Sequence, residues 1–189
     1  MHVLGADQIQ MWIFMSLFMM GPIAVYLAWK NSREVTSAAV MVIGFAIIWA
    51  LAAVPVQLLH EVIRNVQANY AAFALWTIAG AYQFSRMHSS ALSSCVKYSG
   101  SNSFRQGLHT GWQCLVACGL LKIAMMWTLP MNVGVMLACT LVMFFQVIHP
   151  RQMVISRSIG LVGGIYGLGI LFLASPVMQM GTVVIHHHG

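Results

Sequence analysis

Acidic residues are almost absent from this chain, which has three Asp and Glu among 189 residues and 6% charged residues in all. A soluble domain usually has about 25% charged residues. The chain therefore has too few charged side chains to cover itself in water. Because 60% of its residues are hydrophobic, we expect the lipid bilayer to be the solvent for much of its surface.

Several motifs of catalysis and binding are also missing. The sequence has no Ser–His–Asp set, no glycine-rich phosphate loop and no HExxH helix. The net charge of +6 is typical of a nucleic-acid partner in a soluble protein, but here the basic residues lie between apolar runs and indicate membrane topology instead. Asp7 precedes the first apolar run, which is too long for a removable signal peptide, so we expect that run to stay in the membrane.

Continuous apolar runs dominate the rest of the chain. A membrane-spanning helix needs roughly 20 such residues, and six runs approach that length: 10–29, 37–59, 66–84, 107–127, 131–148 and 158–175. Strands are excluded because the apolar residues do not alternate with polar ones. The sequence predicts an all-α fold, a polytopic membrane protein whose residues 1–189 form one domain, a bundle of six transmembrane helices. The small-residue spacing in the sixth run predicts close helix packing there, at Gly160, Gly163, Gly164 and Gly167.

The basic residues fix the predicted orientation. The first, third and fifth connections contain Lys30, Arg33, Arg86, Lys97, Arg105, Arg151 and Arg157, whereas the other connections contain Arg64 alone. Cytoplasmic loops carry an excess of Lys and Arg. We therefore expect the odd connections to be cytoplasmic and both termini to lie on the outer side of the membrane.

The fourth run carries a threonine, two cysteines and a lysine at a regular spacing of four residues, Thr110, Cys114, Cys118 and Lys122. Residues four apart lie on one face of a helix. Thiolates at positions i and i+4 can share a metal ion, although a stable site usually has three or four ligands. Buried Cys also packs as a small hydrophobic residue, and Lys122 is either part of a functional site or a side chain that snorkels to the headgroups.

Other soft ligands lie outside this stripe. The third connection holds His88 and Cys95 and is interpreted either as a solvated loop or as a segment whose Cys95 reaches the cytoplasmic end of the fourth helix. Cytoplasmic thiols are normally reduced, so no structural disulfide is expected there. Cys139 is interpreted as a packing residue. The tract His186, His187 and His188 is interpreted as a metal site, as the remnant of an expression tag or as a terminal tail. The 15 methionines are interpreted as Cu(I) ligands or as lipid-facing and gap-filling residues.

Several of these stretches together resemble a bacterial and archaeal family called domain of unknown function 2182, described as predicted metal-binding integral membrane proteins. The stretch WIFMSLFMMGP resembles its first signature through Trp12, Met15, Met19, Met20 and Pro22. The later matching residues are Tyr82, Gln83, Leu92, Cys95, Gly107, Gly111, Cys114, Cys118, Met131, Asn132, Met136 and Pro150. The chain departs from the family pattern at Phe18, Ala91, Thr110, Val116, Ala117, Gly119 and Gln146. Among the family residues replaced there are two cysteines, a histidine and a glutamate.

The resemblance implies a metal site in the cytoplasmic half of a prokaryotic cell-membrane protein, held by Cys95, Cys114 and Cys118 with His88 and His109 as substitutes. Because part of the ligand set is replaced, the first hypothesis is a non-catalytic accessory subunit of a larger membrane complex, such as a copper-dependent monooxygenase, with other membrane subunits as partners. The second is a metal-handling protein that binds copper or zinc through the three cysteines. The third is a small transporter, although the spans offer no carboxylate to pair with Lys122.

Overall fold

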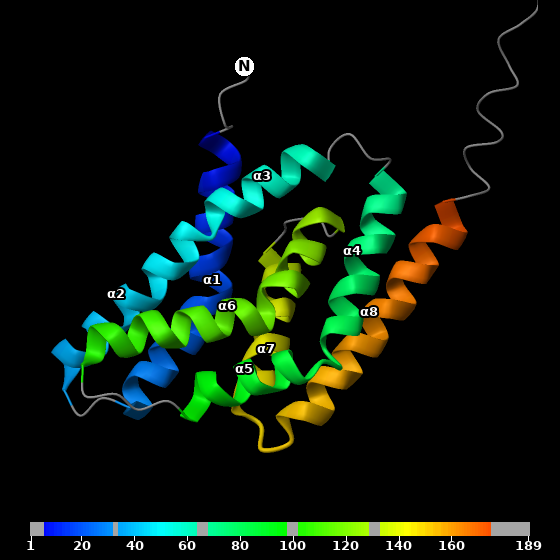
Figure 1. Cartoon of the computed structure of the whole chain (residues 1–189). Helices are drawn as coiled ribbons and strands as arrows, with labels where there is room; N and C mark the ends of the chain where they lie inside the picture. Colours follow the sequence, from blue (N-terminus) through cyan, green and yellow to red (C-terminus); the bar gives the residue numbers. More distant parts are fainter. Residues whose placement is uncertain (1–5, 32–33, 64–67, 98–101, 129–132, 175–189) are drawn as a thin grey trace, which may run out of the picture.

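Helices make up the secondary structure in the described part of the computed structural model, which comprises residues 6–31, 34–63, 68–97, 102–128 and 133–174. In chain order they are α1 (Ala6–Asn31), α2 (Val35–Leu51), α3 (Ala53–Ile63), α4 (Ala68–Tyr82), α5 (Arg86–Lys97), α6 (Ser103–Thr128), α7 (Val133–Ile148) and α8 (Gln152–Ala174) (Figure 1). The predicted all-α class is confirmed over these ranges. The tract His186, His187 and His188 lies outside the described residues.

Four helical stretches are long and apolar enough to cross a membrane. They are Trp12–Lys30, Val35–Ile63, Ser103–Thr128 and Gln152–Phe172. The second stretch joins α2 to α3 with a short break at Ala52. Helices α4 and α7 have 15 and 16 residues, so each extends about 23 Å, which is less than the roughly 30 Å of a bilayer core. The structure thus supports four of the six predicted spans by length.

Helix α5 lies where the solvated-loop interpretation placed no helix, so that interpretation is wrong for Arg86–Lys97. The Ser85 hydroxyl caps its first turn by accepting a hydrogen bond from the His88 backbone N–H at 3.0 Å. Its buried residues are His88, Ala91, Leu92 and Cys95, which follow the i, i+3, i+4, i+7 pattern of an amphipathic helix. Helix α5 packs against α6.

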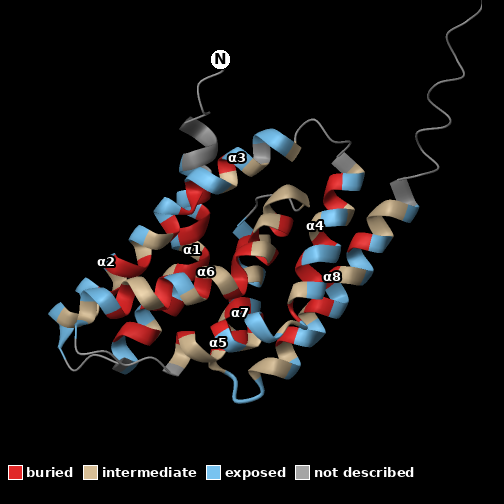
Figure 2. Cartoon of the chain, viewed as in Figure 1, coloured by how far each residue is buried: buried red, intermediate tan, exposed pale blue. Residues whose placement is uncertain are grey.

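Helix α6 lies at the centre of the structure and packs against α2, α4 and α5. Small residues let its backbone reach that of α2. A Cβ atom built on Gly107 would lie 2.1 Å from the Met41 carbonyl oxygen, and one built on Gly44 would lie 2.7 Å from the Phe104 carbonyl oxygen. The contact between α2 and α6 therefore requires glycine on both sides. Figure 2 shows buried residues along these facing sides and exposed residues on the outer sides.

Helices α4 and α8 form a second close pair. A Cβ atom on Gly160 would lie 2.8 Å from the Gly80 carbonyl oxygen, and one on Gly167 would lie 2.8 Å from the Trp76 Cβ. Gly163 faces the Trp76 ring in the same way, at 2.9 Å. Gly164 differs from the other three glycines, because a Cβ atom built on it would meet no atom within 4 Å. The small-residue spacing of α8 thus corresponds to a helix contact within the chain.

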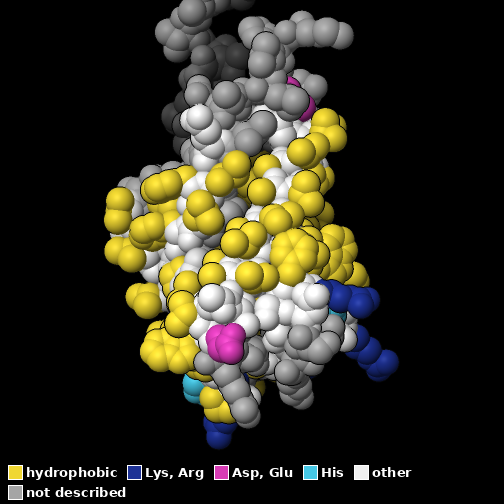
Figure 3. Space-filling view, turned by 90° about the vertical axis from the view of Figure 1, so that its left-hand side faces the viewer, with side chains coloured by type: hydrophobic (Ala, Val, Ile, Leu, Met, Phe, Trp, Pro, Cys, Tyr) yellow, Lys and Arg dark blue, Asp and Glu magenta, His cyan; other side chains and the backbone are white. Residues whose placement is uncertain are grey.

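The outer surface is strongly apolar. Large hydrophobic residues of α8 are exposed, among them Leu161 at 60%, Val162 at 66% and Phe172 at 71%. In Figure 3, hydrophobic side chains cover the middle of the visible face, and Lys and Arg side chains gather toward its lower end. Such a surface is suited to contact with hydrocarbon, which agrees with the membrane location expected from the composition.

Candidate metal-binding site

The four-residue stripe of α6 is fully enclosed. Thr110, Cys114 and Cys118 are each 1% exposed, and Lys122 is 0% exposed. Helix α6 brings them into one row because they are four residues apart. The Thr110 hydroxyl has no hydrogen-bond partner, which is unusual for a buried polar group. The stripe is therefore more than an apolar packing face, since half of its members are polar groups removed from water.

Three cysteine thiols meet at this stripe. The Cys114 side chain makes hydrogen-bonding contacts with Cys118, one turn later on α6, and with Cys95 from α5. All three cysteines are free and buried. Cys114 is thus the middle thiol of a row of three, which we call the thiol row. Within the described ranges, no three or more His, Cys, Asp or Glu side chains form a group that could hold a metal ion by themselves.

Lys122 occupies an aromatic cage next to the thiol row. Its Nζ atom lies 4.2 Å from the centroid of the Trp12 ring and 4.3 Å from that of the Trp49 ring, within the range of cation–π interactions. The ammonium also donates a hydrogen bond to the Ser16 hydroxyl. Because Nζ is enclosed by α1 and α2, the interpretation of Lys122 as a snorkelling side chain is wrong.

The cage is held by hydrogen bonds between its own walls. The Trp12 indole N–H donates to the Trp49 carbonyl at 2.9 Å, and the Ser16 hydroxyl donates to the Trp12 carbonyl at 2.6 Å. The Trp49 indole N–H is buried without a hydrogen-bond partner. The buried residues of the described part of the chain include no Asp or Glu. The cage thus gathers a cation and N–H groups, and no carboxylate is buried with them.

Lys122 and the thiol row interact electrostatically. Both Cys114 and Cys118 are coupled to the Lys122 charge. Lys122 follows Cys118 by one helical turn, about 6 Å along the axis. A negative charge that develops on these sulfur atoms would therefore lie close to the Lys122 amino group and would favour its protonated, positively charged form, because such interactions are strong in a water-free environment.

His88 lies in a different buried cluster. Its two ring nitrogens lie 3.4 and 3.5 Å from the Ser156 hydroxyl, and its Nε2 atom lies 3.5 Å from Gln146 Nε2. Its ring packs edge-on against Tyr82 at 5.7 Å between centroids. The Ser156 hydroxyl donates to Gln83 Oε1 at 2.5 Å. Burial lowers the pKa of His88 to about 4, so the imidazole is neutral at pH 7. The structure surrounds His88 with amide and hydroxyl groups.

The remaining predicted ligands diverge from the thiol row. His109 and Cys114 are five residues apart on α6, which separates their directions by about 140°, and His109 is half-buried. Cys139 is half-buried on α7. The structure thus unites Cys95, Cys114 and Cys118 and leaves His88 and His109 elsewhere. No pattern in the sequence indicated that Trp12, Ser16 and Trp49 would surround Lys122.

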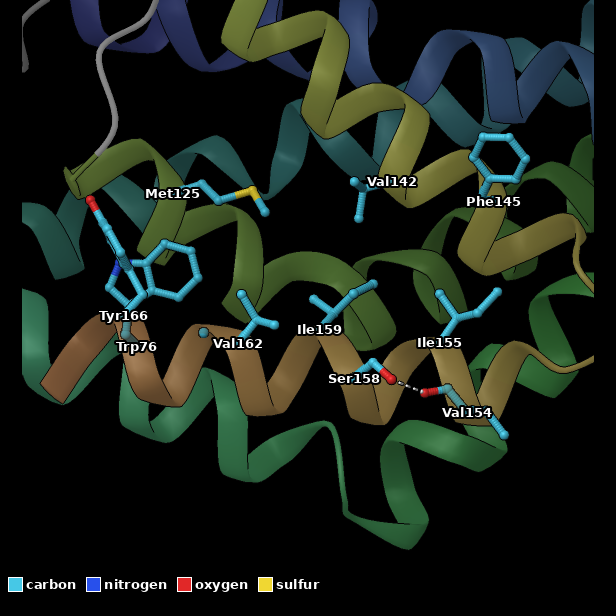
Figure 4. Close-up of a pocket in the computed structure, with 11 residues that line it drawn as sticks. Trp76, Met125, Val142, Phe145, Val154, Ile155, Ser158, Ile159, Val162 and Tyr166 are labelled. Carbon is cyan, nitrogen blue, oxygen red and sulfur yellow. Dashed lines mark hydrogen bonds between the residues drawn. The ribbon is translucent and has the colours of Figure 1, made fainter. Parts of the chain in front are cut away.

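An apolar groove runs between α4, α6, α7 and α8, with a volume of about 610 Å³. Trp76, Met125, Phe145 and Tyr166 contribute to its lining (Figure 4). Among the residues labelled in Figure 4, polar atoms come from the Tyr166 hydroxyl, the Trp76 indole and the Ser158 hydroxyl. The Ser158 hydroxyl donates a hydrogen bond within α8 to the Val154 carbonyl at 3.0 Å. The groove therefore offers an apolar surface and no set of metal ligands.

Fold and site together define a helical membrane-type protein with a buried row of soft ligands. Residues 9–170 match the model of a family described as copper chaperone, PpoB2. This match covers most of the chain, which therefore belongs to that family. Comparison with curated proteins and with solved structures gave no match.

Proposed function

We propose that this chain is a membrane-embedded copper carrier that holds Cu(I) between Cys114 and Cys118, with Cys95 as a neighbouring third thiol. The observation that supports this most directly is the contact of Cys114 with both other thiols, in a chain of the copper chaperone family. Copper is the cargo in this proposal. Thiolates are soft ligands and favour Cu(I).

The number of available ligands favours copper over zinc. A structural zinc site takes four ligands in a tetrahedron, and the described residues provide no closed group of that kind. Cu(I) forms stable complexes with two or three thiolates, which the thiol row can supply. A site with few ligands also suits a carrier, because a partner's ligands can take the ion without first breaking a complete coordination shell.

The membrane arrangement proposed here has six crossings, with the basic connections in the cytoplasm of a prokaryotic cell and both termini outside. In Figure 1, the end of α1, the start of α2 and the α7–α8 connection lie toward the lower part of the picture, whereas the start of α1, the start of α4 and the end of α8 lie toward the upper part. This alternation supports the proposal, because successive crossings must end on opposite sides. Helices α4 and α7 would cross as short members of the bundle.

A second candidate function is that of an accessory subunit, without catalytic activity of its own, in a larger membrane complex such as a copper-dependent oxidoreductase. The groove between α4, α6, α7 and α8 supports this candidate, since a volume of about 610 Å³ with an apolar lining suits a side of a partner's transmembrane helix. Extraction in a mild detergent followed by native mass spectrometry tests it. Migration as a monomer without partners would count against it.

The copper proposal is tested with the purified full chain, kept reduced and loaded with Cu(I). We expect about one copper ion per chain in the wild type, and loss of that ion in Cys114→Ser and Cys118→Ser. The matched control is Cys139→Ser, because Cys139 is a half-buried thiol on α7 outside the thiol row, and it should keep the copper. A wild-type chain that binds no Cu(I), or equal loss in all three variants, would refute the proposal.

A further inference from the structure

We propose that Lys122 makes the thiol row selective for a monovalent soft cation, by supplying the single positive charge that balances a copper–dithiolate group. This inference rests on the proposed function, since it assumes that Cys114 and Cys118 bind the metal as thiolates. The proposed role of Lys122 does not require a hydrogen bond to a sulfur atom or direct binding of the metal. Lys122 would act on the choice of metal through its charge and its fixed position.

The charge balance differs between metals. Two thiolates and one Cu(I) ion carry a net charge of −1, and the Lys122 ammonium brings the group to zero. Two thiolates and one divalent ion such as Zn(II) are already neutral, so the same ammonium leaves a net charge of +1. A buried net charge is costly because the surrounding protein and lipid solvate it poorly. Lys122 should therefore stabilise the Cu(I) complex and destabilise the Zn(II) complex.

The position of the charge is set without a metal ion. The Trp12 and Trp49 rings enclose Nζ at 4.2 and 4.3 Å, and Ser16 accepts its hydrogen bond. Ser16 is itself fixed to the Trp12 carbonyl. Because these partners come from α1 and α2, the ammonium is held against α6 from outside and does not depend on the thiols for its orientation.

No other described group near the site takes the role of counter-charge. Buried Asp and Glu are absent from the described residues, and the Trp49 indole N–H adds a second donor that lacks an acceptor. The titratable groups near enough to Lys122 to interact with its charge are the Cys114 and Cys118 side chains. The structure thus places the buried Lys122 amino group beside two thiols, which would become its anionic partners once they bound a metal as thiolates.

Metal competition tests this inference with Lys122→Met, which removes the charge and keeps an unbranched side chain, and Lys122→Arg, which keeps the charge. Each folded variant is titrated with Cu(I) against a chromophoric Cu(I) chelator and, separately, with Zn(II) against a zinc dye. We expect Lys122→Met to weaken Cu(I) binding at least about tenfold and to strengthen Zn(II) binding. Lys122→Arg keeps the positive charge, so it should keep the wild-type order of preference, Cu(I) over Zn(II).

The outcomes separate this inference from the proposed function. If Lys122→Met keeps the wild-type ratio of Cu(I) to Zn(II) affinity while Cys114→Ser loses copper, the role of Lys122 is refuted and the copper site stands. A wild-type chain that takes up no Cu(I) refutes both. If Lys122→Met does not fold, metal displacement from the Cu(I)-loaded wild-type chain tests the inference instead. Ag(I) should displace Cu(I), whereas Cd(II), a divalent ion that favours thiolates, should not. Displacement by Cd(II) as readily as by Ag(I) overturns the inference.

Discussion

A single methyl group at Gly107 should separate α2 from α6. A Cβ atom there would lie 2.1 Å from the Met41 carbonyl oxygen, 2.9 Å from its carbonyl carbon and 3.0 Å from its Cα. All three atoms belong to the backbone, so no side-chain rotation can relieve the clash. Close carbon–oxygen contacts in proteins lie at about 3.3–3.6 Å. Gly107→Ala must therefore push the two helices apart locally by about 1 Å.

The expected cost follows from two opposing effects. Overpacking of this kind costs about 1–3 kcal/mol, and Gly→Ala in a helix interior returns up to about 1 kcal/mol through helix propensity. The loss of close packing along α2 and α6 adds to the cost, and we expect a net destabilisation of about 2 kcal/mol. The cage should also loosen, because Trp49 lies on α2 and Lys122 on α6.

Thermal unfolding in one detergent gives the measurement, with Gly164→Ala as the matched control. Gly164 is also a helix glycine, but a Cβ atom on it meets no atom within 4 Å, so its replacement should stabilise the chain by up to about 1 kcal/mol. For a chain of this size 1 kcal/mol shifts the midpoint by about 2–4 °C. We expect Gly107→Ala to lower the midpoint by about 4–8 °C. A midpoint equal to or above that of Gly164→Ala would refute the packing argument.

Two further predictions concern the buried polar groups. Burial lowers the pKa of His88 from 6.5 to about 4 in the fold. Between these two pH values the unfolded chain therefore binds more protons than the folded chain. The free energy of unfolding should fall as the pH drops from about 6.5 to about 4. Unfolding measured at a series of pH values should show this dependence of stability on pH, and His88→Gln should weaken it. If the variant keeps the wild-type dependence, another group causes it. Trp12→Phe leaves the Trp49 carbonyl without its donor and should cost about 1 kcal/mol. Trp49→Phe deletes an indole N–H that has no partner and should destabilise the chain less. A thermal midpoint lower for Trp49→Phe than for Trp12→Phe would contradict this difference in hydrogen bonding.

The helical class could be predicted because it depends on a property that each run carries by itself, namely a continuous apolar composition. The lengths of the helices depend on more than composition. The predicted runs 66–84 and 131–148 are mostly apolar, yet in the described part of the chain the helices found there, α4 and α7, have 15 and 16 residues. Hydropathy indicates where a segment is apolar and does not determine where its helical backbone begins and ends.

Helix α5 was missed for a related physical reason. Its composition is polar, with serines at positions 89, 90, 93 and 94, and this suggested a loop. The spacing of His88, Ala91, Leu92 and Cys95 is nevertheless that of an amphipathic helix. Its packing against α6 buries that face, and tertiary packing supplies most of the stability of such a helix.

The candidate site could also be predicted only in part, because some of its features depend on local sequence spacing and others on residues far apart in the chain. The α6 stripe could be predicted from the four-residue spacing, and the approach of Cys95 could be proposed from the predicted topology. The surroundings of Lys122 could not, because Ser16 lies 106 residues away in the chain and Trp12 and Trp49 come from two other helices. No local pattern relates residues that meet only through the packing of three helices.

The role proposed for Lys122 would give a common physical meaning to three of the departures from the resembling family's pattern. Ala91, Ala117 and Gln146 stand where that pattern has two cysteines and a glutamate, and all three positions are buried. Each family residue would add a negative charge once it bound a metal as thiolate or carboxylate. Their replacement by neutral residues leaves few anionic ligands in a bundle that contains a buried ammonium. Under the charge balance proposed above, such a site would be adapted to an ion of charge +1 with two thiolates, so these replacements would alter which metal the site prefers while keeping its ability to bind one.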